Sequence, residues 1–137
     1  MKRFPFSFPI LPVVSVVLVV IAAACGSSNT NPTAPDTGAP GPSGATMTIG
    51  ANGVLSPKDV SITRGQSVTI VNSHNIVHDM TSDPHPNHTD CPAINAVGLL
   101  QPGQTKITNA LSTARTCGIH DHTRETDANL QGRITIQ

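Results

Sequence analysis

The sequence has no tryptophan and no tyrosine, and all three of its phenylalanines lie within the first ten residues. Any domain that follows them must therefore build its core from valine, isoleucine, leucine, methionine and alanine. A purely aliphatic core in a short chain is small, and small domains are often stabilised by a disulfide or a bound metal. The missing aromatic residues thus direct attention to cysteine and to metal ligands.

Charged residues are also scarce, with 8 Lys and Arg against 8 Asp and Glu in 137 residues. Two of the basic residues, Lys2 and Arg3, stand at the N-terminus, so the rest of the chain has 8 − 2 = 6 basic residues and a net charge near −2. Phosphate binding needs a concentrated basic patch. The composition therefore predicts that nucleic acid is not a partner.

The N-terminal segment has the pattern of an export signal. Lys2 and Arg3 precede an apolar run over 10–24, which is shorter than the roughly twenty residues of a transmembrane helix. We therefore predict a signal peptide over 1–24. The ending Ala22-Ala23-Ala24-Cys25 resembles a bacterial lipobox, which implies an acylated Cys25 that anchors the protein to the outer face of a bacterial membrane, in the periplasm or at the cell surface. Ordinary cleavage near Ala24 is the alternative, and both imply export.

The next segment, 26–45, consists of Gly, Ser, Thr, Asn, Pro and Ala with a single charge at Asp36. Such a composition buries too little apolar surface to offset its ordering entropy. We expect a disordered tether here and a single folded domain over 46–137.

The folded part has the short alternating runs of β-strands. Two of them, 59–63 and 67–71, are rich in β-branched residues and flank the turn Arg64-Gly65-Gln66, which predicts that they pair with each other. No segment shows a sustained helical period. Short strands at roughly ten-residue spacing predict an all-β sandwich. The full set of expected strands is 47–49, 59–63, 67–71, 78–82, 104–108, 114–118 and 132–136.

The sequence is rich in histidine. Its six histidines are His74, His78, His85, His88, His120 and His122. Two of them follow a cysteine in the pattern C-x-x-H-x-H, over 117–122. One thiolate with two imidazoles is the ligand set of a trigonal copper site that transfers electrons. A ligating imidazole also needs an acceptor for its second nitrogen, and Asp79 and Asp121 are adjacent candidates.

Four motifs in order resemble the cupredoxins, the class of blue copper proteins that contains plastocyanin and azurin. A strand after the Gly65 turn ends in Asn72, and His78 follows it. Next come the turn Pro102-Gly103 and then the Cys117 motif before a last strand that opens at Gly132. The resemblance covers nearly all of 46–137 and implies a Greek-key β-sandwich that binds one copper ion.

The same resemblance implies that His78, Cys117 and His120 are the copper ligands, with His122 as the alternate or supporting one. It implies one-electron carriage between redox partner proteins, without turnover of a substrate. One position departs from the family, because Leu130 stands where the axial methionine is normally found.

Other interpretations stay open. With Cys25 acylated, Cys91 and Cys117 are an even pair in an oxidising compartment, which is most simply a disulfide. That bond would leave only an imidazole-based site, as in a copper-buffering or delivery protein, or a structural domain without a metal. The loop over 83–91 also contains a second candidate cluster, His85, His88 and Cys91, although the prolines beside these histidines need not bring them together.

Overall fold

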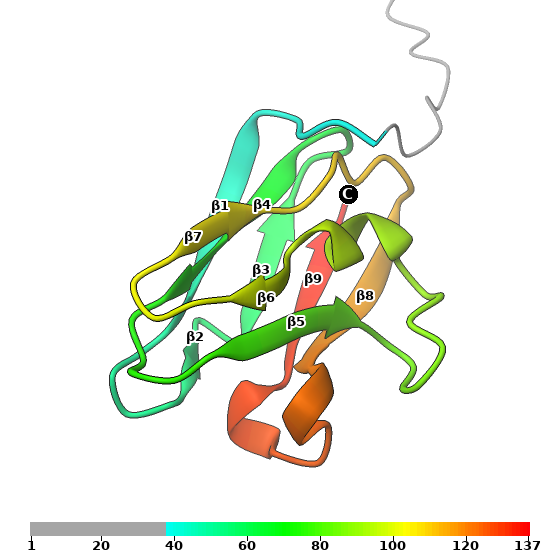
Figure 1. Cartoon of the computed structure of the whole chain (residues 1–137). Coiled ribbons are helices and arrows are strands. Elements are labelled where there is room, and N and C mark those ends of the chain that lie inside the picture. The colour runs from blue at the N-terminus through cyan, green and yellow to red at the C-terminus, as the bar shows by residue number, and fades with distance from the viewer. Residues whose placement is uncertain (1–37) are drawn as a thin grey trace, which may run out of the picture. The chain divides into compact units, whose positions relative to one another are not determined.

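Nine strands form two sheets in the computed structural model, which describes residues 38–137 (Figure 1). The predicted signal peptide, Cys25 and most of the expected tether lie outside the described residues. The predicted all-β sandwich is confirmed. Among residues 38–137 there is no helix long and apolar enough to cross a membrane.

The first sheet has four strands. Its order is β2 (Leu55–Ser56), β1 (Ser43–Ile49), β4 (Ser67–Asn72) and β7 (Thr105–Ile107). The neighbours β1 and β4 run parallel, and the other pairs are antiparallel.

The second sheet has five strands and carries most of the residues of interest. Its order is β3 (Asp59–Ile62), β9 (Gly132–Ile136), β8 (Arg115–Asp121), β5 (His78–Ser82) and β6 (Gly98–Leu100). Only β3 and β9 are parallel. Three short 3-10 helices complete the described chain: η1 (Pro92–Ala96), η2 (His122–Arg124) and η3 (Ala128–Leu130).

The core forms where the alternating strands turn their aliphatic residues inward. In β9, Ile134 and Ile136 are buried while Arg133 and Thr135 face outward, as a period of two requires. Both methionines of the described residues, Met47 and Met80, are fully buried in this core. Neither is therefore at a surface site.

The predicted pairing of 59–63 with 67–71 is wrong. The strand β3 pairs with β9, whereas β4 pairs with β1 and β7 in the other sheet. The turn between them, with Gly65 at a φ of 83°, therefore carries the chain from one sheet to the other. Period-two alternation identifies strands but does not tell a hairpin from a crossing between sheets.

The domain also begins earlier than predicted. Strand β1 starts at Ser43, and the amide of Ala110 donates to the carbonyl of Ala39 at 3.0 Å. The last residues of the expected tether are therefore ordered, because they form the start of β1, which pairs with β4.

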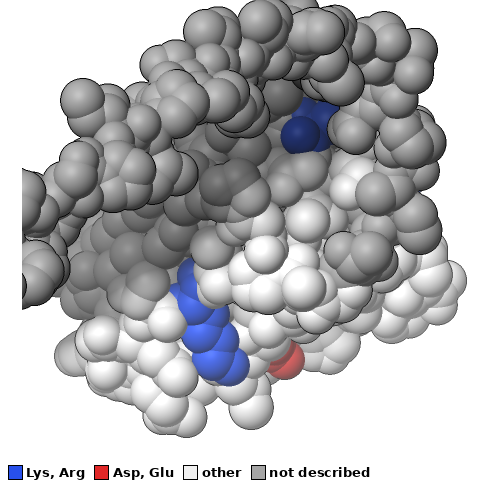
Figure 2. All heavy atoms as spheres, turned by 90° about the horizontal axis from the view of Figure 1, so that it is seen from above, with Lys and Arg blue, Asp and Glu red and all other residues white. Residues whose placement is uncertain are grey.

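The strand β8 is longer than expected, and this matters for the site. The sequence predicts an end at Gly118, but the strand continues to Asp121. Figure 2 views the molecule from above, and most of the described atoms visible on that face belong to uncharged residues.

Candidate metal centre

The two faces of β8 separate the residues of the C-x-x-H-x-H pattern. Cys117, Ile119 and Asp121 are buried on the inner side, and the alternation of a strand places Gly118 and His120 on the outer side. The spacing suggests one ligand loop, but Cys117 and His120 stand within one strand and face opposite ways.

Cys117 is bonded to Cys91 in a disulfide that closes a separation of 26 residues. Its sulfur is thus not a thiolate, so the prediction of Cys117 as a copper ligand is wrong for this structure. The alternative hypothesis, a disulfide between Cys91 and Cys117, describes what the structure contains. A trigonal site of one thiolate and two imidazoles does not fit this chain.

His78 lies on the inner side as well, as the first residue of β5. Its Nδ1 is 2.6 Å from Oδ2 of Asp121, and its Nε2 is 2.9 Å from Nδ1 of His74. The expected acceptor at Asp121 is therefore used by His78, and His74 stacks on the same ring with centroids 5.2 Å apart.

The predicted ligands His78, Cys117 and His120 do not converge. The register pairs Met80 with Asp121, so Cys117 stands four residues, or about 13 Å, along β8 from the carboxylate that binds His78. His120 faces the other side of the sheet. The sheet therefore separates His120 from the other two groups, and the distance along β8 separates Cys117 from His78.

A different cluster of histidines does converge. Ring nitrogens of His85, His88 and His122 all lie within 4.8 Å of one another, and this is the single group of potential metal ligands found in residues 38–137. Nε2 of His88 is 2.7 Å from Nδ1 of His122. The ring centroids of His85 and His122 are 5.1 Å apart. His122 was a predicted ligand, whereas His85 and His88 come from the loop that was the lesser candidate.

His88 is held in place by several contacts. Its Nδ1 lies 2.8 Å from the carbonyl oxygen of Ser82, and its own carbonyl accepts from Ser82 Oγ at 3.0 Å and Asn95 Nδ2 at 2.9 Å. It is also the only non-glycine residue of the described chain with a positive φ, 51°. Such a backbone costs energy and is common at functional sites. The contacts leave Nε2 of His88 directed at His122.

His120 borders the same cluster. Its Nδ1 is 2.6 Å from Oδ1 of Asp83, and its ring centroid lies 5.2 Å from that of His88 and 6.0 Å from that of His85. The residue is only 3% exposed, and its buried Nε2 has no hydrogen-bond partner. A buried nitrogen without a partner is costly. A metal ion would remove that cost.

These residues fit a metal ion bound by imidazoles. His88 and His120 each use Nδ1 on an oxygen acceptor, which is the usual orientation of metal-bound histidine. Nε2 of His120 has no partner, and Nε2 of His88 faces Nδ1 of His122. Two nitrogens on one ion, each at about 2.0–2.1 Å, lie at most about 4 Å apart. The 4.8 Å limit of the cluster is near that value, and His85, which is exposed, has room to move inward.

The carboxyl group of Asp121 is buried and lies between His120 and His122 in the sequence, and its pKa is shifted. Burial by itself raises the pKa of Asp121, but hydrogen bonds from His78 and Thr123 outweigh it and hold the pKa below its ordinary value of 3.8. Asp121 is therefore an anion that orients His78 and Thr123.

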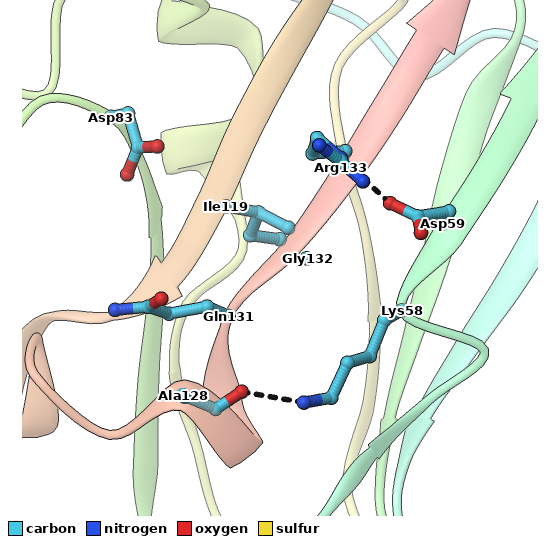
Figure 3. Close-up of a pocket in the computed structure, with 8 residues that line it drawn as sticks. All are labelled: Lys58, Asp59, Asp83, Ile119, Ala128, Gln131, Gly132 and Arg133. Atoms are coloured by element: carbon cyan, nitrogen blue, oxygen red, sulfur yellow. Dashed lines mark hydrogen bonds and ion pairs between the residues drawn. The ribbon is translucent and has the colours of Figure 1, made fainter.

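A groove whose lining includes no histidine lies next to the site. Figure 3 shows it beside β8 and β9, with a volume of about 370 Å³. Its cationic groups are already paired: Arg133 Nε donates to Asp59 at 2.9 Å, and Lys58 Nζ donates to the carbonyl of Ala128 at 2.6 Å. Asp83, at its edge, links this groove to His120, which borders the histidine cluster.

Comparisons with solved structures identify the fold. A purple cupredoxin from Nitrosopumilus maritimus matches with a TM-score of 0.52 and 17% identity, over 68% of this chain and 99% of that one. Oxidised plastocyanin from Dryopteris crassirhizoma matches at 0.53 and 18%, over 67% and 99%. A mutant of amicyanin in its Cu(I) form matches at 0.53 and 15%, over 69% and 83%. The chain therefore has the cupredoxin fold.

The sequence has no match among models of protein families or among curated proteins. At 15–18% identity, these three likenesses establish the architecture and leave the ligand set to be inferred from the residues themselves. The spacing H-x-x-H in the loop before Cys91 was the available signal for His85 and His88. This signal was weak, because the prolines beside the two histidines gave no indication that the loop folds back over His120.

Proposed function

We propose that the protein is an exported copper-binding protein that holds one copper ion through His85, His88 and His122, with His120 as the inner ligand. Its role is to buffer or deliver copper. The observation that carries the proposal is the convergence of ring nitrogens from two segments, 34 to 37 residues apart in the sequence, within 4.8 Å.

The choice of copper has two supports. Imidazole suits copper, zinc and nickel, and among divalent ions of this series Cu(II) binds most tightly to a given site. The fold is also shared with amicyanin solved in a Cu(I) form. When bound, copper would supply reversible one-electron chemistry.

The groups around the cluster orient the ligands. Asp83 and the carbonyl of Ser82 occupy Nδ1 of His120 and His88, so their Nε2 atoms face the metal position. His85 is exposed, and His88 and His122 are partly exposed, so an ion can enter and leave through solvent. This accessibility favours exchange of the ion over permanent retention.

One-electron transfer to redox partner proteins is the second candidate function. It is favoured by the fold, since amicyanin and fern plastocyanin have been solved in both oxidised and reduced forms. It would need an imidazole-bound copper that changes oxidation state without leaving the protein.

Copper titration tests the proposal. With Cu(II), we expect one equivalent bound, a weak visible band and nitrogen hyperfine splitting in the electron paramagnetic resonance spectrum. His88→Asn, which suits a positive φ but removes the ring, should weaken binding at least tenfold. His74→Asn, outside the cluster, is the matched control and should bind as the wild type does.

Equal binding by the His88→Asn variant would exclude the proposed site. An intense absorption near 600 nm would instead reveal a thiolate ligand and refute the imidazole set. Reduction to Cu(I) separates the two functions. Copper that is released or passed to a chelator supports buffering and delivery, and copper that cycles without loss supports electron transfer.

Export and lipid anchoring at Cys25 complete the proposal, and they are supported by the sequence alone. Cys25→Ala should move the protein from the membrane fraction to the soluble exported fraction. An unchanged membrane fraction would exclude the lipid anchor without affecting the metal site.

A further inference from the structure

We infer that the disulfide between Cys91 and Cys117 positions the metal ligands, by clasping the loop that carries His85 and His88 onto the strand that carries His120. The inference rests on the proposed copper site. The cysteine that the fold family would lead one to expect on the metal then acts at a distance, through the backbone.

The loop over 83–91 is tied down at both ends. It leaves β5 at Ser82, where the amide of Asp83 donates to the carbonyl of Gly118 at 3.1 Å, and it ends at Cys91, bonded to Cys117. The two residues that hold the ends of the loop, Gly118 and Cys117, both belong to β8, the strand that carries His120. Ligands from the loop and from β8 are therefore held against each other by one covalent and one hydrogen-bonded link.

A second path runs from the disulfide to His88 through η1. This helix begins directly after Cys91, and its Asn95 makes two contacts with the ligand segment. Asn95 Oδ1 accepts from the amide of Ser82 at 2.9 Å, and Asn95 Nδ2 donates to the carbonyl of His88 at 2.9 Å. Fixing Cys91 thus fixes the residue that holds the backbone of His88.

A third path reaches His120. The amide of Asp90 donates to the carbonyl of Asp83 at 2.8 Å, and the carboxylate of Asp83 binds the ring of His120. Asp90 is also paired with Arg115, two residues before Cys117 on β8. The end of the loop next to the disulfide therefore supports the acceptor of the inner ligand.

The bond is suited to a lasting structural role. Cys91 is 3% exposed and Cys117 is fully buried, so a dithiol reductant reaches the sulfurs only when the domain opens. Reduction would transfer two electrons and two protons from that dithiol, breaking the sulfur–sulfur bond and leaving two thiols on the protein and a disulfide on the reductant. The loop would then be free to move away from His120 and His122.

The test compares Cu(II) affinity in the purified wild type, the double variant Cys91→Ala/Cys117→Ala and a control, by competition with a chelator of known affinity. We expect the double variant to bind copper about 10–100-fold more weakly, the usual loss when a support of metal ligands is removed. Leu55→Ala, a core truncation in the other sheet, is the control for general destabilisation and should bind as the wild type does.

The outcomes separate this inference from the proposed function. No His88-dependent copper binding by the wild type would remove the site itself. Binding by the wild type with equal affinity in the double variant would overturn the clasp alone. If the double variant does not fold, the variant Asn95→Ala provides the test. It keeps the disulfide and removes the hydrogen bonds that connect η1 to the backbone of Ser82 and His88. Unchanged affinity in that variant would overturn the inference, and a loss of tenfold or more would support it.

Discussion

Loss of the disulfide should cost this domain much of its stability. The bond closes a separation of 26 residues. In the chain-entropy model, the unfolded chain without it gains about 2.1 + 1.5R ln 26, or about 11.8 cal/mol/K, which is about 3.5 kcal/mol at 298 K. Small domains are stabilised by roughly 5–15 kcal/mol in total. The variant Cys91→Ala/Cys117→Ala should therefore be marginally stable.

Urea unfolding followed by far-ultraviolet circular dichroism measures this difference. The signal must come from the backbone, because the sequence has no tryptophan or tyrosine to report unfolding by fluorescence. Metal-free protein should be used, so that copper binding does not add to the stability of the native state. For a domain of this size the expected fall in melting temperature is roughly 14–28 °C.

A loss of stability below about 1 kcal/mol with an unchanged denaturant slope would contradict this entropic origin of the stabilisation. That result would mean that the unfolded chain is already restricted, so closing the loop removes little entropy. Leu55→Ala provides the scale, because truncating a fully buried leucine costs about 2–5 kcal/mol.

Two further substitutions test the parts of the site separately. Gly118→Ala should weaken copper binding about 10–100-fold, because a Cβ there would overlap the carboxylate of Asp83 and push it away from His120; chelator competition measures it, and unchanged affinity would show that Asp83 does not support the site. Asp121→Asn should lower the free energy of unfolding by about 1–3 kcal/mol at neutral pH, because His78 loses a buried charged partner. The pKa of Asp121 is lowered in the folded protein, so its stabilisation is fully present above the unfolded value near 3.9 and is lost as the pH falls through the lower folded value. Urea unfolding from pH 7 to pH 2 should therefore show the wild type and the variant converging at the acid end, and a constant gap would contradict the assignment.

Much of the architecture could be predicted from alternation and turn residues. The runs 59–63, 67–71 and 132–136 correspond closely to β3, β4 and β9. Their partners could not be predicted, because the same turn at Gly65 can close a hairpin or carry the chain to a second sheet. The choice depends on which aliphatic faces meet in the core.

The ligand prediction failed for a related reason. The spacing of Cys117 and His120 is compatible with a loop, where both side chains could reach one ion, or with a strand, where they face opposite sides. The structure extends β8 through both residues, so Cys117 enters the core and His120 meets the loop over 83–91. The pairing of Cys91 with Cys117 was one of the hypotheses that the sequence left open.

By itself, the sequence determined that a histidine-rich chain with no Phe, Tyr or Trp after its first ten residues folds as a small β-sandwich and that this part contains Cys91 and Cys117 as an even pair, because these properties follow from composition and from a period of two. Only the tertiary structure decided which histidines meet. His85 and His88 approach His122 because a loop folds back across the outer face of a sheet, and that contact depends on the register of β5 against β8 and on a bond between residues 26 positions apart. Neither leaves a local pattern in the chain.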